Sequence, residues 1–496
     1  MEMIRMQEHD VIIIGAGLAG LTAGAKLAKE GKKIFLIEQH SKIGGCATTF
    51  QRKIEGKQVT FEVGLHEMNG LDDELDPKRE YFLDLGVFEN VDFIRLPEFY
   101  RFINGRIDVV VPFDVSEAIK SLLKVFPKEE IAIKTFFSDI CSIFGNINRM
   151  MEFSSTSVGE YLEDLTSNED LKLVLSANLG YYGDDPYTLS LVFFSAPQGS
   201  FFKGGGHYIK GGSQSLSDYL GKVIIDNGGK IFRNHLVTKI IIKDNTAIGV
   251  KYIKKNQRET LEHQVIGKVT IANAAIPNVV NKLLGKAFLD TEYQHNVNSL
   301  EIACSLLCVF LAFSQPPSSI GNKNYSTFIY DKNLTLKDIS SIQRSNDYSK
   351  KGFVFVDYSI IDSNLTKEGY VGVITTTDYL EHWENLCEDE YQVKKNLVQN
   401  VLIERLEKTF PGIREIIIYT EVATPKTIKR YTSNPGSVYG FAQTIEQAGP
   451  RIRAIRKPPI NNLFFASAWS GVGGFSGAIH AGYTCALKIL KDYWKD

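Results

Sequence analysis

A glycine-rich turn between two apolar runs constrains the fold of this 496-residue chain more than any other feature of the sequence. Residues 11–14 are entirely apolar, residues 15–20 read GAGLAG, and residues 34–37 form a second apolar run that ends at Glu38. Leu18, Leu21, Ala25 and Ala28 lie between the two runs at helical spacing. This order predicts a strand, a tight turn, a helix and a second strand parallel to the first.

The turn has the glycines that a dinucleotide requires. The first glycine permits the tight turn, the second lets the backbone approach a pyrophosphate, and the third allows the helix to pack closely on the strand. The N-terminus of the helix directs N–H groups and a partial positive charge at the phosphates. Glu38 is placed to accept hydrogen bonds from ribose hydroxyls. The predicted cofactor contacts here are Gly15, Gly17, Leu18, Ala19, Gly20 and Glu38.

A second glycine pair, Gly44-Gly45, follows the acid and would bring another turn to the same pyrophosphate. Residues 10–70 resemble the flavin-binding N-terminus shared by amine oxidases, phytoene desaturases, carotenoid isomerases and retinol saturases, in which this pair marks FAD. The segments GGCATTF at 44–50 and FEVGLH at 61–66 are most similar to the retinol saturase and carotenoid isomerase branch. Cys46 departs from the wider pattern, in which an Arg follows the glycines.

Later segments extend the resemblance over most of the chain. They are YIKGGS at 208–213, ANAAIP at 272–277, ATP at 423–425, GSVYG at 436–440, NLFFA at 462–466 and GGFSGAI at 473–479. The last segment could provide backbone donors to the flavin ring at the start of a helix. The further FAD contacts that the resemblance implies are Gly44, Gly45, Cys46, Thr48, Val237, Gly473, Gly477, Ala478 and Ile479.

We therefore expect an α/β fold with a discontinuous Rossmann-type FAD-binding domain and an inserted mixed α+β substrate domain. The predicted FAD-binding domain comprises residues 1–74, 206–285 and 456–496. The predicted substrate domain comprises residues 75–205 and 286–455. This division accounts for a length that exceeds one ordinary hydrophobic core.

The resemblance implies an FAD-dependent oxidoreductase that acts on C=C or C–C bonds of a polyene or isoprenoid lipid by hydride transfer at flavin N5. Saturation, desaturation and cis–trans isomerisation all remain open. One alternative is a flavin amine or amino-acid oxidase. Another is a prenyl-lipid binding protein of the Rab escort type without redox chemistry, against which the intact glycines, Glu38 and the C-terminal motif argue.

Two histidines, His66 and His480, lie within the family motifs expected near the flavin ring, and either could donate a proton. The alternative is a structural hydrogen-bonding role, and the same holds for Glu62, Tyr208 and Lys210. No HxxxH pair is present, and the six cysteines form no CxxC pair, so we expect no metal site.

Aromatic residues make up 11% of the chain, including 30 Phe, and several cluster in the predicted substrate domain. We interpret them as the wall of an apolar tunnel for a lipid, or as a dock on a membrane surface, with core packing as the alternative. The predicted substrate-binding residues are Phe193, Phe194, Phe201, Phe202 and Tyr208.

The charges nearly cancel, with 56 Lys and Arg against 58 Asp and Glu, so nucleic acid is not an expected partner. The scattered cysteines favour a reducing cytoplasm. Residues 461–487 contain no charged residue, but their glycines, serines and asparagines favour a strand, a glycine-rich loop and a helix over a membrane span. We expect a cytoplasmic protein with a hydrophobic lipid or small-molecule substrate. The sequence leaves open its oligomeric state and whether it makes a peripheral contact with the membrane surface.

Overall fold

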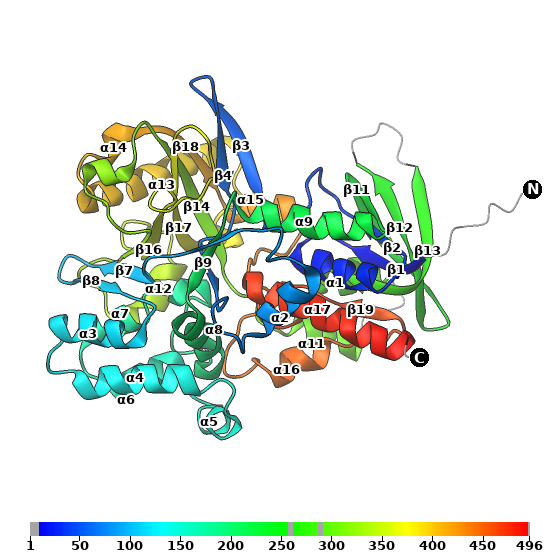
Figure 1. The fold of residues 1–496 in the computed structure, drawn as a ribbon, viewed down its shortest axis with the longest axis horizontal. Coiled ribbons are helices and arrows are strands. Elements are labelled where there is room, and N and C mark those ends of the chain that lie inside the picture. The colour runs from blue at the N-terminus through cyan, green and yellow to red at the C-terminus, as the bar shows by residue number, and fades with distance from the viewer. Residues whose placement is uncertain (1–8, 256–260, 286–290, 495–496) are drawn as a thin grey trace, which may run out of the picture.

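The computed structural model describes residues 9–255, 261–285 and 291–494. Within these ranges the chain forms two seven-stranded sheets, one in each half of the molecule in Figure 1. The strand β1 (His9–Ile14) and the helix α17 (Gly474–Tyr493), near the two ends of the described chain, both lie in the half that contains the first sheet.

The first sheet confirms the predicted α/β class. Its strand order is β10-β2-β1-β13-β12-β11, with β19 beside β13. The pairs among β10, β2, β1, β13 and β19 are parallel, whereas β11, β12 and β13 form an antiparallel meander. The strands are β1 (His9–Ile14), β2 (Ile34–Ile37), β10 (Lys230–Phe232), β11 (His235–Lys243), β12 (Thr246–Lys254), β13 (Glu262–Ala272) and β19 (Leu463–Phe465).

Residues 11–14 of β1 are all apolar because both faces of the strand are buried there. Val11 and Ile13 pack into one core cluster, and Ile12 and Ile14 pack into another. The first cluster is covered by α1 (Leu18–Lys29), which packs against α9 (Ser213–Asp226) and α17 (Gly474–Tyr493). Small residues allow this close approach, because a Cβ on Gly24 of α1 would lie 2.7 Å from the Cδ1 atom of Ile224.

The second sheet has the order β18-β14-β17-β16-β15-β7-β8. All its neighbouring pairs are antiparallel except β15 with β7. The long helix α13 (Glu388–Thr409) packs its apolar residues on one face. The strands are β7 (Tyr100–Ile103), β8 (Asp108–Val111), β14 (Ser305–Phe313), β15 (Ser326–Ile329), β16 (Phe353–Asp357), β17 (Tyr370–Asp378) and β18 (Ile417–Ala423).

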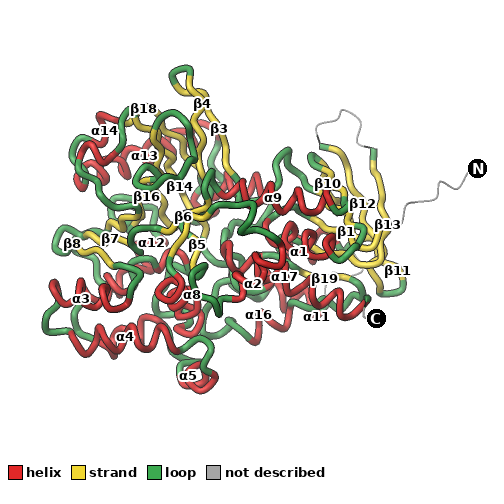
Figure 2. The backbone as a smooth tube through the Cα atoms, in the orientation of Figure 1, coloured by secondary structure: helices red, strands yellow, loops and turns green. Residues whose placement is uncertain are grey.

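A group of helices from residues 115–204 packs beside the second sheet, in the lower left of Figure 2. These are α3 (Val115–Val125), α4 (Glu130–Ser142), α5 (Ile147–Glu152), α6 (Val158–Leu165), α7 (Glu169–Leu175) and α8 (Leu191–Gly204). The other helices are α2 (Pro77–Leu85), α10 (Ile276–Asn278), α11 (Glu292–Asn298), α12 (Ile339–Arg344), α14 (Ile413–Ile416), α15 (Pro425–Thr432) and α16 (Pro450–Ile455).

Two small sheets complete the fold. Strands β3 (Thr49–Ile54) and β4 (Lys57–Glu62) form a hairpin, and β9 (Gly206–Ile209) pairs with β5 (Met68–Asn69) and β6 (Phe93–Arg95). Because β9 joins strands from both sides of residue 75, it leaves the exact domain limits undecided. The boundaries at 74, 205, 285 and 455 stay a prediction.

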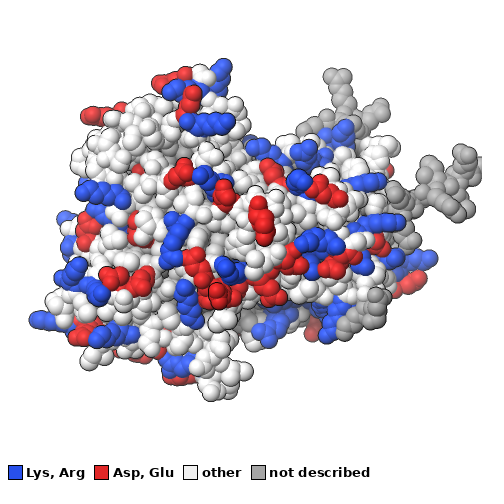
Figure 3. All heavy atoms as spheres, in the orientation of Figure 1, with Lys and Arg blue, Asp and Glu red and all other residues white. Residues whose placement is uncertain are grey.

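The uncharged stretch 461–487 contains β19, a glycine-rich turn and most of α17, as its composition indicates. Of the helices that the structure describes, none is long and apolar enough to cross a membrane. On the face drawn in Figure 3, basic and acidic side chains are interspersed, in keeping with a formal net charge of −2.

Candidate FAD cradle and substrate cavity

The first part of the site is the N-terminus of α1. The helix begins at Leu18 after Gly17, and no side chain caps this end. The first N–H groups of a helix have no partner within the helix, so the backbone here can bind an anion. This is where the sequence predicts the pyrophosphate.

Side chains are excluded from this turn by Asn273 and by the carbonyl group of Gly15. Gly15 has φ of +91°, and its carbonyl oxygen accepts a hydrogen bond from Asn273 Nδ2 at 3.0 Å. A Cβ on Gly17 would lie 2.9 Å from Asn273 Nδ2, and a Cβ on Gly20 would clash with the carbonyl oxygen of Gly15. Glycine is therefore favoured at each of these three positions, because a Cβ atom there would lie too close to neighbouring atoms.

The second glycine pair lies directly against the first turn. The Gly44 N–H donates to the Ala16 carbonyl at 2.7 Å, and Gly17 and Gly44 form a parallel bridge. Gly44 and Gly45 both have positive φ, and a Cβ on Gly45 would lie 3.2 Å from the Gly17 Cα. The two turns form a backbone cradle without side chains, which fits the pyrophosphate of FAD.

Glu38 is held at one side of this cradle. Its carboxylate accepts the N–H groups of Ala16 at 2.7 Å and His40 at 2.8 Å. Burial raises the pKa of Glu38, while these two N–H groups act in the opposite direction. The N–H of His235 on β11 donates to the Glu38 carbonyl at 2.8 Å, and Val237 follows on that strand. The carboxylate and β11 therefore flank the predicted ribose position.

Cys46 and Thr48 follow the second glycine pair. The Cys46 thiol is free and exposed. The Thr48 hydroxyl donates to Gln214 Oε1 on α9 and is therefore already paired. Their predicted roles at the cofactor stay a prediction.

A second uncapped helix N-terminus, that of α17, lies at the other end of the predicted flavin position. The helix begins at Gly474 after Gly473, and a Cβ on Gly477 would clash with the Val472 carbonyl. Ala478 and Ile479 are buried just inside the helix. Because residues 473–477 border a cavity, their backbone faces a space that a ligand can reach.

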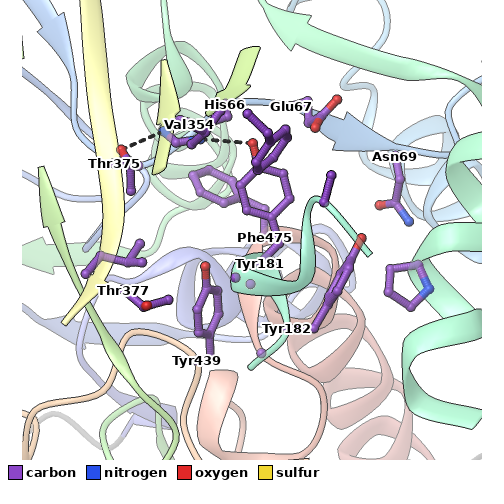
Figure 4. A pocket seen from close by; sticks show the side chains of 18 of the residues that line it. His66, Glu67, Asn69, Tyr181, Tyr182, Val354, Thr375, Thr377, Tyr439 and Phe475 are labelled. Carbon is purple, nitrogen blue, oxygen red and sulfur yellow. Dashed lines mark hydrogen bonds between the residues drawn. The ribbon is translucent and has the colours of Figure 1, made fainter. Parts of the chain in front are cut away.

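The cavity has a volume of about 190 Å³ and lies between the start of α17 and the second sheet. Its walls come from segments that are far apart in the sequence: residues 64–69, residues 180–182, α8, strands β14 to β17, and residues 439–443. Nine tyrosines and phenylalanines contribute to the lining: Tyr181, Tyr182, Phe193, Phe201, Phe328, Tyr330, Phe353, Tyr439 and Phe475. Figure 4 shows this aromatic enclosure from close by.

The structure divides the predicted substrate-binding aromatics into two groups. Phe193 and Phe201 line the cavity, because Phe193, Pro197 and Phe201 recur every four residues on one face of α8. Phe194 and Phe202 point into the core instead, where their ring centroids lie 5.4 Å from Tyr182 and 5.2 Å from Phe99. The positions of Phe194 and Phe202 therefore correspond to core packing, which was the alternative to substrate contact.

Tyr208 also lies outside the cavity lining. It is fully buried, and its hydroxyl donates to Glu62 at 3.4 Å. Glu62 accepts the Ser213 N–H at 2.8 Å and the Ser213 hydroxyl at 2.7 Å, and so ties β4 to the start of α9. Lys210 forms a 2.6 Å ion pair with Asp362. These residues have structural partners rather than a place at the cavity.

His66 lines the cavity as the sequence predicts for a residue near the flavin. Its Nδ1 lies 3.2 Å from the Tyr181 hydroxyl and its Nε2 lies 3.3 Å from the Thr375 hydroxyl, as the dashed lines in Figure 4 mark. Burial lowers the pKa of His66 to about 4. The ring is therefore neutral at pH 7 and is a poor source of a proton.

His480 lies apart from His66. It is exposed on α17, and its Nδ1 is 3.0 Å from the Tyr81 hydroxyl. It is not among the residues that line the cavity. The structure thus brings one of the two predicted histidines to the cavity and leaves the other on the helix surface.

Glu67 is a cavity residue that the sequence reasoning missed. Both of its carboxyl oxygens are buried and have no hydrogen-bond partner among the described residues. Burial, together with the charge of Glu98, raises the pKa of Glu67 well above its ordinary value. Its environment therefore favours the protonated form of the carboxyl group. The available signal was an acid directly after the FEVGLH motif.

Comparisons with known proteins identify the family of this chain. The family model for flavin-containing amine oxidoreductases matches residues 18–490. The all-trans-retinol 13,14-reductase of Danio rerio is 27% identical over 98% of this chain and 86% of that protein. Prolycopene isomerase 2 of an Oncidium hybrid cultivar is also 27% identical, over 98% of this chain and 84% of that protein.

A solved structure shows the same fold. Cyclohexylamine oxidase from Brevibacterium oxydans IH-35A has a TM-score of 0.65 and 14% identity, and the match covers 99% of this chain and 100% of that one. Together with the glycine cradle, the family match over most of the chain shows FAD as the cofactor. The chain therefore belongs to the flavin-containing amine oxidoreductase family and is an FAD-dependent oxidoreductase.

Proposed function

We propose that this protein acts on carbon–carbon double bonds of a polyene or isoprenoid lipid. The observation that carries the proposal is the aromatic cavity that begins at the N-terminus of α17. An apolar, aromatic wall suits a conjugated hydrocarbon chain. The relatives named for retinol reduction and prolycopene isomerisation support this substrate class.

FAD, when bound, supplies the redox chemistry by exchanging a hydride at its N5 atom with a substrate carbon. The chain's own residues hold the reacting carbons in place and handle the proton. The uncapped backbone of residues 473–477 stabilises negative charge at this end of the cavity. The aromatic walls exclude water from the double bond.

We propose that Glu67, rather than His66, donates the proton to the substrate. Glu67 holds a proton at a carboxyl oxygen because burial and Glu98 disfavour its charged form, whereas His66 is neutral. In reduction, Glu67 would give this proton to the carbon next to the one that receives the hydride, and solvent would restore it. In isomerisation, the same proton could be added and removed. His66 positions Tyr181 and Thr375 through its two ring nitrogens.

The direct test is turnover. FAD-loaded protein, reduced chemically under anaerobic conditions, is mixed with all-trans-retinol or with prolycopene, and the products are separated by chromatography. Formation of a saturated or isomerised polyene is the expected result. If neither polyene changes while amines are oxidised with release of hydrogen peroxide, the protein is an amine oxidase and the proposal is wrong.

The amine alternative has one point in its favour, since Glu67 lies near tyrosine rings where a substrate ammonium could bind. A protonated carboxyl group, however, gives such a cation little attraction. The polyene reading therefore describes this cavity better.

We further propose contact with a membrane surface, because an apolar polyene lipid partitions into membranes. Phe144, Ile147 and Met151, at and just before α5, are each more than half exposed. Helix α5 projects from the lower edge of the molecule in Figure 1. Exposed apolar side chains in one short segment can enter the lipid interface. Co-sedimentation with phospholipid vesicles tests this contact.

A further inference from the structure

Two buried polar atoms on the second-sheet side of the cavity have no hydrogen-bond partner within the described part of the chain: Gln343 Oε1 and Thr377 Oγ1. Gln343 belongs to α12 and Thr377 to β17, and both residues line the cavity. Their exposed fractions are 6% and 2%. Buried polar groups are almost always hydrogen-bonded, so two unpaired ones at a single cavity indicate a ligand that pairs with them.

The orientation of Gln343 is determined by its neighbours. Its Nε2 donates to the Gly352 carbonyl at 3.3 Å, and that carbonyl also accepts the Thr376 hydroxyl at 2.7 Å. Rotating the amide by half a turn would place its oxygen against the Gly352 oxygen. Gln343 therefore presents a hydrogen-bond acceptor within the cavity that Thr377 also lines.

Three successive threonines of β17 differ in whether their hydroxyl groups have a partner within the protein. The Thr375 hydroxyl contacts His66 Nε2 at 3.3 Å, and the Thr376 hydroxyl donates to Gly352. Only at Thr377, of these three, does the protein leave the hydroxyl without a partner. Figure 4 places Thr377 beside the cavity with Tyr439 on the same side of the view.

We propose that Gln343 and Thr377 form a subsite for a hydroxyl group at one end of the lipid substrate. Gln343 Oε1 accepts the hydrogen of that hydroxyl, and Thr377 Oγ1 donates to its oxygen. Because Gln343 offers an acceptor, the subsite selects an end group that carries a donor, which excludes a hydrocarbon, an ether and an ester. The inference rests on the proposed function and narrows its substrate class to an isoprenoid alcohol.

The subsite also orients the substrate. It lies on the second sheet, whereas residues 473–477 border the same cavity from α17. An alcohol bound at Gln343 and Thr377 would extend its hydrocarbon chain along the aromatic wall toward the start of α17. The hydroxyl end is thereby kept away from the reacting carbons.

The test uses three ligands that differ only at one end: retinol, its methyl ether, and the hydrocarbon in which a methyl group replaces the hydroxymethyl group. Binding to the FAD-loaded protein is measured by equilibrium titration. We expect the wild type to bind the alcohol at least about tenfold more tightly than the other two. Q343L should abolish this preference, and T377V should reduce it several-fold.

A matched control is T327V. Thr327 also carries a buried, unpaired hydroxyl, but it lies on β15 outside the cavity lining, so its loss should leave the preference unchanged. Melting temperature and FAD content verify that each variant is folded.

Each outcome of the titration bears on the subsite. An equal affinity for the three ligands in the wild type, a failure of all three to bind, or a preference that survives both Q343L and T377V would overturn it. Turnover of polyenes without an alcohol preference would leave the proposed function intact and remove only the subsite. An alcohol preference that depends on Gln343, in a protein that converts no polyene, would uphold the subsite and remove the proposed function.

Discussion

The glycine cradle and the aromatic cavity are joined at α17, yet they bind by different means. In the cradle the backbone forms the surface, and the one acidic side chain, Glu38, has both carboxyl oxygens paired with N–H groups. In the cavity the side chains form the surface, and Glu67, Gln343 and Thr377 hold polar atoms that the described protein leaves unpaired. A cradle of this kind fits one invariant cofactor, whereas a cavity of this kind is adapted to a particular substrate and its chemistry.

Replacing the acid of the cavity should have the largest effect. E67Q keeps the size of the side chain but removes its transferable proton, so the rate of polyene reduction should fall by about 10²–10⁴-fold. FAD content and substrate affinity should stay near the wild-type values. Stopped-flow measurement of flavin oxidation checks the rate, and an unchanged rate would exclude Glu67 as the proton donor.

The pH profile provides the control for this prediction. Because Glu67 must be protonated to act, the wild-type rate should fall as pH rises through its raised pKa. E98Q removes the negative charge that helps to raise this pKa, so the fall should move to lower pH. If the rate falls at the same pH in E98Q as in the wild type, the titrating group is not Glu67.

A substitution in the glycine cradle should mainly weaken FAD binding. In G20V the new side chain would meet the Gly15 carbonyl, and FAD binding should weaken by about 100-fold, equivalent to about 3 kcal/mol of overpacking. The matched control is G183A, where the nearest atom would lie at an ordinary 3.6 Å. Absorbance of the purified proteins and FAD released on denaturation measure the difference; equal FAD content in the two variants would contradict a phosphate turn at Gly20.

The carboxylate of the cradle should matter less than its glycines. E38A removes the predicted ribose acceptor, at a loss of about 1–3 kcal/mol of FAD binding. Isothermal titration of the apoprotein with FAD provides the affinity. E38Q, which keeps one acceptor oxygen, should recover part of the loss, whereas wild-type affinity in E38A would exclude the ribose contact.

The smallest effect is expected outside both regions, at α5. The double variant I147D and M151D adds charge to two exposed apolar positions and should lower vesicle binding several-fold. Turnover of a detergent-solubilised substrate should not change, because neither residue lines the cavity. Equal co-sedimentation of variant and wild type would remove this segment from the membrane contact.

The difference between the two regions also explains what could be predicted from the sequence. Gly15, Gly17, Gly20 and Glu38 are close together in the chain, and the geometry of a tight turn leaves few other residue types for those positions. The fold class and the strands around them were therefore predictable. By contrast, Phe193 and Phe194 are adjacent in sequence, and only the helical rotation of α8 decides that one lines the cavity while the other enters the core.

The sequence by itself determined the α/β class, the dinucleotide turn and the resemblance to flavin oxidoreductases, because these depend on short-range order along the chain. Only the tertiary structure decided which polar groups meet at the cavity. Glu67 lies in the loop before β5, Gln343 on α12 and Thr377 on β17, and nothing in their spacing relates them. Burial in a shared apolar enclosure raises the pKa of Glu67 and keeps His66 neutral. It also makes the missing hydrogen-bond partners of Gln343 and Thr377 costly, and burial depends on the packing of distant segments.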